Sequence, residues 1–139
     1  MKRRLWAACL LGGLLLAACA PSDAVRVGRQ IGAALYLPTS LPSGMRLASV
    51  QRIGPHMAFL SYRGGRGAMS IFESPQPIAP PPGATRDKHG VWRAAAVVGG
   101  QPQLSALMRL HGEFVEVIAV GVGEDGLAQL MQNWQRVGP

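Results

Sequence analysis

Glu113-Phe114-Val115-Glu116-Val117-Ile118-Ala119-Val120 is the most β-branched stretch of this 139-residue sequence. Its alternation predicts a strand that places Val115, Val117 and Ala119 on one face. The opposite face then carries Phe114, Glu116, Ile118 and Val120. Because both faces are largely apolar, we expect this strand to lie in the centre of a sheet.

A second strand is predicted immediately before it, over residues 104–110. His111-Gly112 then forms a two-residue hairpin turn in which Gly112 supplies a positive φ. A further strand is predicted over residues 91–98, which precede this pair. The alanines at 94–96 are helix formers, but the valines of this run and the following Gly99-Gly100 favour a strand.

Three more strands are predicted in the first half of the chain, over residues 46–53, 57–63 and 68–74. Gly54-Pro55 separates the first two, and the glycine-rich residues 64–67 connect the last two as a hairpin.

A proline-rich loop, residues 75–83, interrupts the predicted sheet within a longer irregular segment that ends near Gly90. Its five prolines favour a polyproline-like conformation. Such a loop can be a ligand for an aromatic groove, but a stiff connection is the favoured interpretation.

One clear amphipathic helix is predicted over residues 126–137, with Asp125 as its N-cap. Its apolar stripe consists of Leu127, Leu130, Met131, Trp134 and Val137. The expected fold class is therefore α+β, an antiparallel sheet of about six strands packed by a C-terminal helix. The alternative is a sheet closed toward a barrel, with the helix filling one side.

The N-terminus has the order of a signal peptide, with basic residues 2–4 followed by the 12 apolar residues 5–16. Leu16-Ala17-Ala18-Cys19 then matches a bacterial lipobox, in which the cysteine is lipidated and the chain is cut before it. An ordinary secretory signal cut nearby is the less favoured alternative. The apolar segment is short of the ~20 residues that span a bilayer.

Three segments follow from this interpretation. Residues 1–18 are a lipoprotein signal peptide, residues 19–36 a lipid-anchored linker with a short helix, and residues 37–139 a single α+β domain. Acyl chains such as palmitate on Cys19 would hold the protein to a membrane of the cell envelope, facing the periplasm or exterior. Ala20 is not the aspartate that retains lipoproteins in the inner membrane, so the outer membrane is favoured where two membranes exist.

The charge also changes on cleavage. Removing 18 of the 139 residues leaves 121, and loss of the basic residues 2–4 lowers the net charge from +7 to +4. The remaining basic residues are dispersed and have no interleaved aromatics, so nucleic acid is not an expected partner.

No catalytic, metal or cofactor site is expected. His56, His89 and His111 lie in predicted turns or loops without a second ligand at metal-binding spacing, and no Gly-x-Ser-x-Gly elbow occurs. Glu113 and Glu116 fall on opposite faces of their strand, and Glu116 is expected to pair with Arg109 or Arg93. The chain is therefore not expected to be an enzyme.

Several short motifs occur along the chain in a recognisable order. They are Leu41-Pro42-Ser43-Gly44-Met45, residues 59–65 (FLSYRGG), residues 68–73 (AMSIFE), residues 95–100, residues 116–121 and the last helix. Over residues 37–137 this order resembles the C-terminal domain of the MucB/RseB-type periplasmic sigma-E regulatory proteins. It is also similar to the related domain of lipoprotein-carrier-like sporulation and anti-sigma proteins.

The resemblance implies binding rather than catalysis, because this domain of the regulatory family contacts the periplasmic part of an anti-sigma factor. The larger lipid-carrier-like domain of that family has no counterpart in the roughly twenty residues before the match. The expected function is thus a lipid-anchored, non-catalytic protein-binding module of a regulatory, anti-sigma-associated kind, with an envelope protein as partner. The alternative is a carrier or sensor of a hydrophobic ligand such as lipid.

Overall fold

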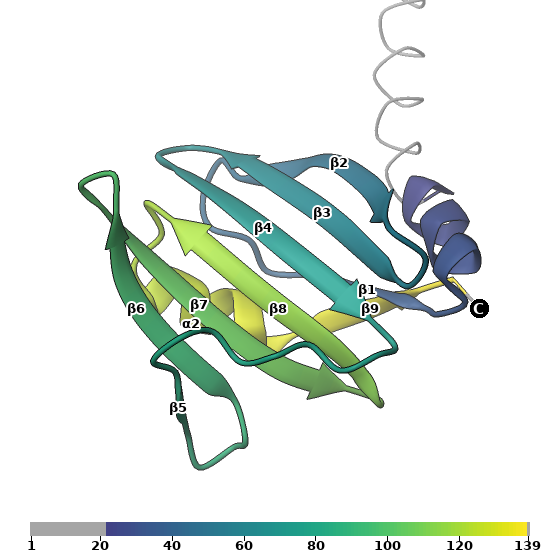
Figure 1. Cartoon of the computed structure of the whole chain (residues 1–139). Helices are drawn as coiled ribbons and strands as arrows, with labels where there is room; N and C mark the ends of the chain where they lie inside the picture. The colour runs from purple at the N-terminus through teal and green to yellow at the C-terminus, as the bar shows by residue number, and fades with distance from the viewer. Residues whose placement is uncertain (1–21, 139) are drawn as a thin grey trace, which may run out of the picture.

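The computed structural model describes residues 22–138, and its main feature is a seven-stranded antiparallel sheet (Figure 1). Its strands are β2 (Arg46–Ile53), β3 (Met57–Gly64), β4 (Gly67–Ser74), β5 (Thr85–Arg86), β6 (Trp92–Val98), β7 (Gln101–Leu110) and β8 (Glu113–Val120). The spatial order is β2-β3-β4-β8-β7-β6-β5. The α+β fold class is confirmed, and the sheet is open rather than closed into a barrel.

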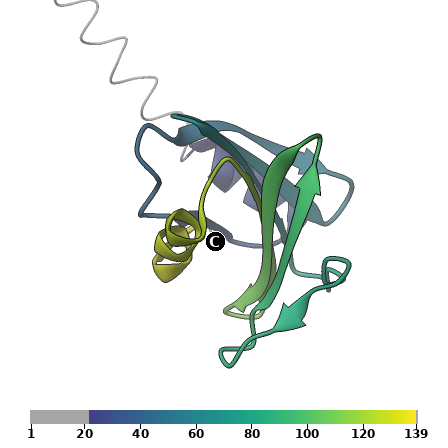
Figure 2. The same cartoon turned by 90° about the vertical axis from the view of Figure 1, so that its left-hand side faces the viewer.

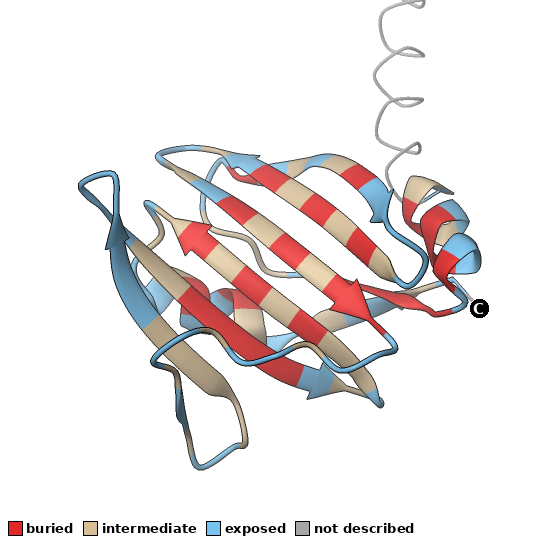
Figure 3. Ribbon diagram, viewed as in Figure 1, coloured by how far each residue is buried: buried red, intermediate tan, exposed pale blue. Residues whose placement is uncertain are grey.

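The predicted central strand is confirmed, because β8 is the middle strand of the seven. It pairs with β4 on one side and β7 on the other, so that Val117 lies between Ile71 and Ala106. The alternation is also as predicted: Val115, Val117 and Ala119 are 0% exposed, whereas Glu116 and Ile118 between them are half-buried (Figure 3).

The predicted count of six strands was too low. All six predicted strands are present, but the large sheet gains β5, a two-residue strand inside the segment expected to be irregular. Two residues carry no detectable periodicity, so only their pairing with Trp92 and Arg93 of β6 identifies them. The connection between β3 and β4 is also tighter than expected, because Gly64 pairs with Gly67 and only two residues form the turn.

A second sheet of two strands joins the two ends of the described chain. It pairs β1 (Leu35–Pro38) with β9 (Trp134–Val137), and the register places Leu35 opposite Val137. Neither strand was predicted, and β9 occupies residues that were assigned to the last helix.

That helix, α2 (Glu124–Gln132), starts earlier and ends earlier than the predicted range of 126–137. Asn133 is extended, with φ −136° and ψ 129°, and the chain continues into β9. Gly123 occupies the N-cap without a side-chain hydrogen bond, so the predicted Asp125 cap was wrong. Asp125 lies in the first turn, where its negative charge interacts favourably with the positive end of the helix dipole.

Residues 22–31 form the other helix, drawn in purple in Figure 1. Ala24, Val27 and Ile31 recur at helical spacing, are at most 4% exposed and belong to the same core cluster as the sheet. The described part of the expected linker, residues 19–36, is therefore an integral part of the domain.

Both helices and the two-stranded sheet cover one face of the large sheet, which we call the inner face (Figure 2). The core between these layers includes Leu60, Ile71 and Val117 of the sheet and Leu130 of α2, all 0% exposed. The proline-rich loop runs over the opposite, outer face (Figure 1).

Two of the short sequence motifs pack against each other. Gly64, at φ +133°, lies against the carbonyl of Gly44, and a side-chain carbon at residue 64 would overlap that oxygen. Gly65 is similarly close to Ser43. The motifs at 41–45 and 59–65 therefore specify a packed junction of two turns.

Candidate functional site

The predicted lipidation site, Cys19, and the predicted signal peptide, residues 1–18, lie outside the described residues. Within residues 22–138, no helix is long and apolar enough to cross a membrane.

The three histidines lie at three separate places. His56 is exposed in the turn between β2 and β3, His89 is exposed between β5 and β6, and His111 is exposed in the β7–β8 turn. The ring of His111 stacks on Tyr36, with 5.8 Å between centroids and 16° between planes. Across the described chain no three His, Cys, Asp or Glu residues are grouped so that they could hold a metal ion.

A buried carboxyl group was missed by the sequence reasoning. Glu73 on β4 is 0% exposed, and its Oε1 accepts a 2.8 Å hydrogen bond from the Tyr36 N–H. Its Oε2 has no partner among the described residues. Burial raises the pKa of Glu73 well above its usual value, and the nearby Glu113 raises it further.

Glu113 complements this arrangement on β8. Burial raises the pKa of Glu113, while Arg136 and the Ala34 N–H oppose that shift. The two carboxyl groups thus accept backbone N–H groups of residues 34 and 36, which attaches the start of β1 to the large sheet. This is a structural role, and the alternation Met69, Ile71, Glu73 was the signal that placed an acid on the inner face.

The predicted ion pair of Glu116 was wrong. Arg93 instead bonds Asp87, with 3.0 Å between Nε and Oδ2, and the guanidinium of Arg109 lies 5.0 Å from the ring centroid of Phe114. Glu116 faces Phe72 and Leu107 in the neighbouring strands, and burial raises its pKa.

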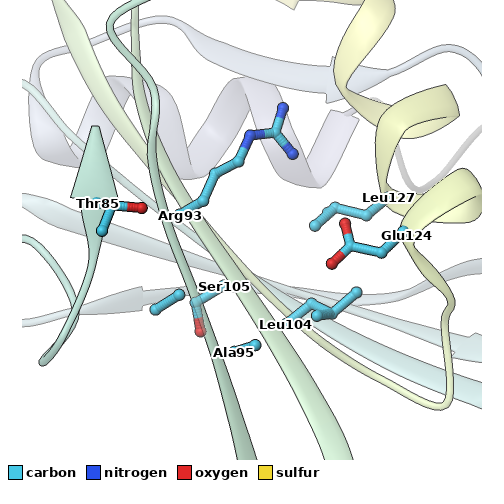
Figure 4. A pocket seen from close by; sticks show the side chains of 8 residues that line it. Thr85, Arg93, Ala95, Leu104, Ser105, Glu124 and Leu127 are labelled. Carbon is cyan, nitrogen blue, oxygen red and sulfur yellow. The ribbon is translucent and has the colours of Figure 1, made fainter. Parts of the chain in front are cut away.

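A groove lies between α2 and the strands at the β5 end of the sheet. We call this feature the α2 groove. Its first cavity has a volume of about 230 Å³. The residues that line it are Thr85, Arg93, Ala94, Ala95, Leu104, Ser105, Glu124 and Leu127. Figure 4 shows Leu127 and Glu124 pointing from the helix toward Leu104 and the strands.

A second cavity continues the α2 groove along the helix, with a volume of about 250 Å³. It is lined by Asp87, His89, Val91, Arg93, Met108, Ala128, Met131 and Gln132. Arg93 lines both cavities and therefore lies between them.

Local hydrogen bonds hold the two charged side chains Asp87 and Arg93 of the α2 groove in place. Asp87 Oδ1 accepts N–H bonds from Val91 at 3.0 Å and from His89 at 2.8 Å, and its Oδ2 accepts from Arg93. These bonds, first that from Val91, lower the pKa of Asp87 against a smaller opposing effect of desolvation. Arg93 is thereby held in place, and the groove around it is otherwise largely apolar.

The α2 groove opens at an unpaired strand edge. β5 pairs only with Trp92 and Arg93 of β6, so within the described chain residues 94–98 have no strand partner on the side away from β7. Val97 and Val98 at this edge are 74% and 57% exposed. An apolar groove beside free backbone groups can bind a polypeptide.

Other hollows are of similar size and lie elsewhere. One of about 230 Å³ lies on the outer side between the proline-rich loop and the sheet, with Ile78, Pro80, Trp92 and Phe114 among its lining residues. Apolar side chains of the proline-rich loop thus line a hollow on the outer face of this chain's own sheet.

Comparison with known proteins finds similarity to solved structures only. No family model matches the sequence, and no curated protein matches it. A solved structure, the crystal structure of MucB in complex with MucA(peri), is similar to this chain with a TM-score of 0.49 and 16% sequence identity. The similarity covers 75% of this chain and 37% of that chain. Membership of the regulatory family stays a prediction from the sequence motifs.

Proposed function

We propose that this chain is a lipid-anchored lipoprotein of the bacterial cell envelope that binds another protein and catalyses no reaction. Lipidated Cys19 would hold it at the membrane, and the domain of residues 22–138 would face the periplasm or exterior. The proposed location rests on the basic, apolar and lipobox order of residues 1–19.

One observation carries the binding role: the α2 groove opens directly onto the unpaired edge of β6. Backbone N–H and C=O groups at a free edge can pair with an incoming chain, and the adjoining apolar cavity can accept a side chain from it.

The alternative function, a carrier or sensor of lipid, is less well supported. Pockets that enclose small molecules have volumes of roughly 300–1,000 Å³, whereas the cavities of the α2 groove have about 230 and 250 Å³. The two helices and the two-stranded sheet cover the inner face of the large sheet, and the buried side chains of the described residues form one core cluster there.

A finer proposal is that the partner belongs to an anti-sigma pathway. It rests on the sequence motifs that this chain shares with the regulatory family. Because the motifs around Gly44 and Gly64 pack against each other, they support a shared fold more directly than a shared partner-binding surface. Mixing the purified chain with the purified periplasmic part of an anti-sigma factor from the same organism would test this. A one-to-one complex on gel filtration would support the proposal, and no complex at micromolar concentrations would contradict it.

The anchor is tested by Cys19→Ser. Lipidation needs the thiolate as nucleophile, and a serine hydroxyl is a poor substitute. We expect the variant to move from the membrane fraction to soluble or unprocessed forms, with loss of the acyl mass. Ala20→Ser is the matched control and should stay lipidated; a Cys19→Ser protein that remained fully processed and membrane-bound would refute the anchor.

The binding role is separated from the carrier role by two measurements on the full chain purified in mild detergent. Crosslinking in the intact envelope should give a discrete adduct with a protein, which reconstitutes from purified components. Native mass spectrometry should find no stoichiometric bound lipid beyond the covalent anchor. A stoichiometric lipid without a reconstituted protein complex would favour the carrier.

A further inference from the structure

The large sheet has two edges with opposite characters. The β2 edge carries Arg46 and Arg52, and its register shifts between Leu47 and Ser49. Charged side chains and irregularities of this kind prevent a strand edge from pairing with another chain. The edge at residues 94–98 has neither, because Ala94-Ala95-Ala96-Val97-Val98 contains no charge or proline and pairs with β7 in an unbroken register.

The free backbone groups at this edge can be assigned. The Asp87 N–H donates to the Val91 carbonyl at 2.9 Å, so Val91 presents its backbone groups to the edge away from β7. Backbone groups of alternate residues point to the same edge of a strand. Ala95 and Val97 therefore present their N–H and C=O groups outward, and β5, which begins opposite Arg93, does not extend alongside them.

The side chains at the same edge are unusually exposed. The large hydrophobic residues that are exposed among residues 22–138 are Ile53, Val97 and Val98. Two of these three stand next to each other at the end of β6. Burial of apolar surface stabilises a protein by about 25 cal/mol per Å². A strand added at this edge would cover part of these side chains and so gain that free energy.

The first cavity of the α2 groove lies beside this edge. A strand added next to β6 points every second side chain toward the inner face, where Ala95, Leu104 and Leu127 line the cavity. An apolar cavity of about 150 Å³ accepts a benzene ring, so the observed 230 Å³ can hold one large apolar side chain. Arg93 at this cavity is already paired with Asp87, and Ala95, Leu104 and Leu127 line the cavity with apolar surface that suits an apolar side chain (Figure 4).

A second copy of this chain fits the edge less well. Symmetric pairing of β6 strands would use the five open residues, 94–98, on each side. A stable interface takes about 20–30 residues a side. The inward side chains that a second β6 would supply here, Ala95 and Val97, are also too small to fill a cavity of about 230 Å³.

We propose that the edge of β6 at residues 94–98 binds an extended segment of a partner protein as an additional strand, with one large apolar side chain in the adjoining cavity. Recognition is through the partner's backbone amides and that single side chain. The proposal rests on the proposed protein-binding function and specifies its surface.

The test uses Val97→Pro in the full chain. Proline at 97 removes an N–H that points away from β7, so the bonds to β7 remain while the ring blocks the edge. Val97→Thr is the matched control, because threonine keeps the β-branched shape and the N–H. Urea unfolding of both variants verifies that each remains folded.

The probe is a random dodecapeptide library selected on the immobilised full chain in detergent, followed by the synthetic form of the selected peptide. We expect the peptides to share one large apolar residue and to bind the wild type and Val97→Thr alike. Binding to Val97→Pro should be weaker by about tenfold, the scale of a lost hydrogen bond with added steric exclusion. The amides of Ala95 and Val97 should become protected from hydrogen exchange in the complex.

Three results would overturn the proposal. One is equal binding of the peptide to Val97→Pro and the wild type, or protection confined to another surface. Another is a concentration-dependent dimer of the wild type that Val97→Pro abolishes, which would identify a second copy as the occupant. The third is a reconstituted envelope complex that Val97→Pro forms as well as the wild type; the protein-binding function would then stand and the β6 edge would not be its site.

Discussion

Leu130→Ala tests whether α2 forms a fixed wall of the groove. Leu130 is 0% exposed and belongs to the core cluster together with the inner face of the sheet. If the helix is docked as observed, this side chain has no route to water, and its truncation leaves a cavity between two layers that cannot move independently.

The magnitude follows from what the substitution removes. Leucine to alanine deletes the equivalent of about three methylene groups, worth about 0.8 kcal/mol each. The remaining cavity raises the total toward the measured range of about 2.7–5.0 kcal/mol for fully buried leucines. We therefore expect a loss of about 3–4 kcal/mol from a free energy of unfolding of about 5–15 kcal/mol.

The assay is urea unfolding of the full chain in mild detergent, followed by tryptophan fluorescence. With an m-value of about 2 kcal/mol per M, the midpoint should fall by about 1.5–2 M. Gln132→Ala, at the exposed end of the same helix, should change stability by less than about 0.5 kcal/mol. Indistinguishable midpoints for the two variants would refute the docked helix and remove the wall of the α2 groove.

Three further predictions concern other parts of the core. Burial raises the pKa of Glu73, so the folded state keeps this proton at pH values where the unfolded chain has lost it, and wild-type stability should fall as pH rises from the usual carboxyl pKa through the raised folded pKa; Glu73→Gln should abolish this part of the fall in thermal melts recorded at increasing pH, and an unchanged slope would contradict the assignment. Gly64→Ala should lower the melting temperature, because the added carbon would overlap the Gly44 carbonyl, whereas Gly99→Ala has only the cost of its positive φ and should be milder; equal losses would contradict the close approach. Trp134→Ala should cost less than the roughly 3–5 kcal/mol of a fully buried tryptophan, because Trp134 is half-buried in β9, and a loss as large as that of Leu130→Ala would contradict this placement.

The six predicted strands could be read from the sequence because alternation is a local property. The run at residues 113–120 carries enough β-branched residues to predict a central strand, and glycine-containing turns mark its limits. The two strands β1 and β9 could not be predicted in this way. Each has four residues, and both depend on a partner about a hundred positions away.

The boundary of α2 shows why local patterns fail at the end of the chain. Leu127, Leu130 and Trp134 continue a helical spacing, so nothing local distinguishes a helix through Val137 from a helix that stops at Gln132. Pairing with β1 decides between them, and tertiary contacts of this kind override intrinsic preference. The anchor residue Cys19 could be predicted from the lipobox alone, whereas the α2 groove required the spatial approach of residues 93–95 to residue 127.

The buried acid at position 73 is an intermediate case. Its face was readable from Met69 and Ile71, but the N–H group that it accepts comes from Tyr36, in a segment that the sequence predicts to be a linker. The sequence could therefore indicate that a carboxyl group pointed inward and could not indicate what satisfied it.

The pairing of β1 with β9 also sets an order in time. A ribosome releases Leu35–Pro38 about a hundred residues before Trp134–Val137, an interval of roughly 5–20 s at about 5–20 residues per second. Throughout that interval the first strand has no partner, and the two-stranded sheet is complete only after Trp134–Val137 has been made. A chain broken off before Trp134 would therefore leave β1 unpaired and Leu35 without the strand that covers it.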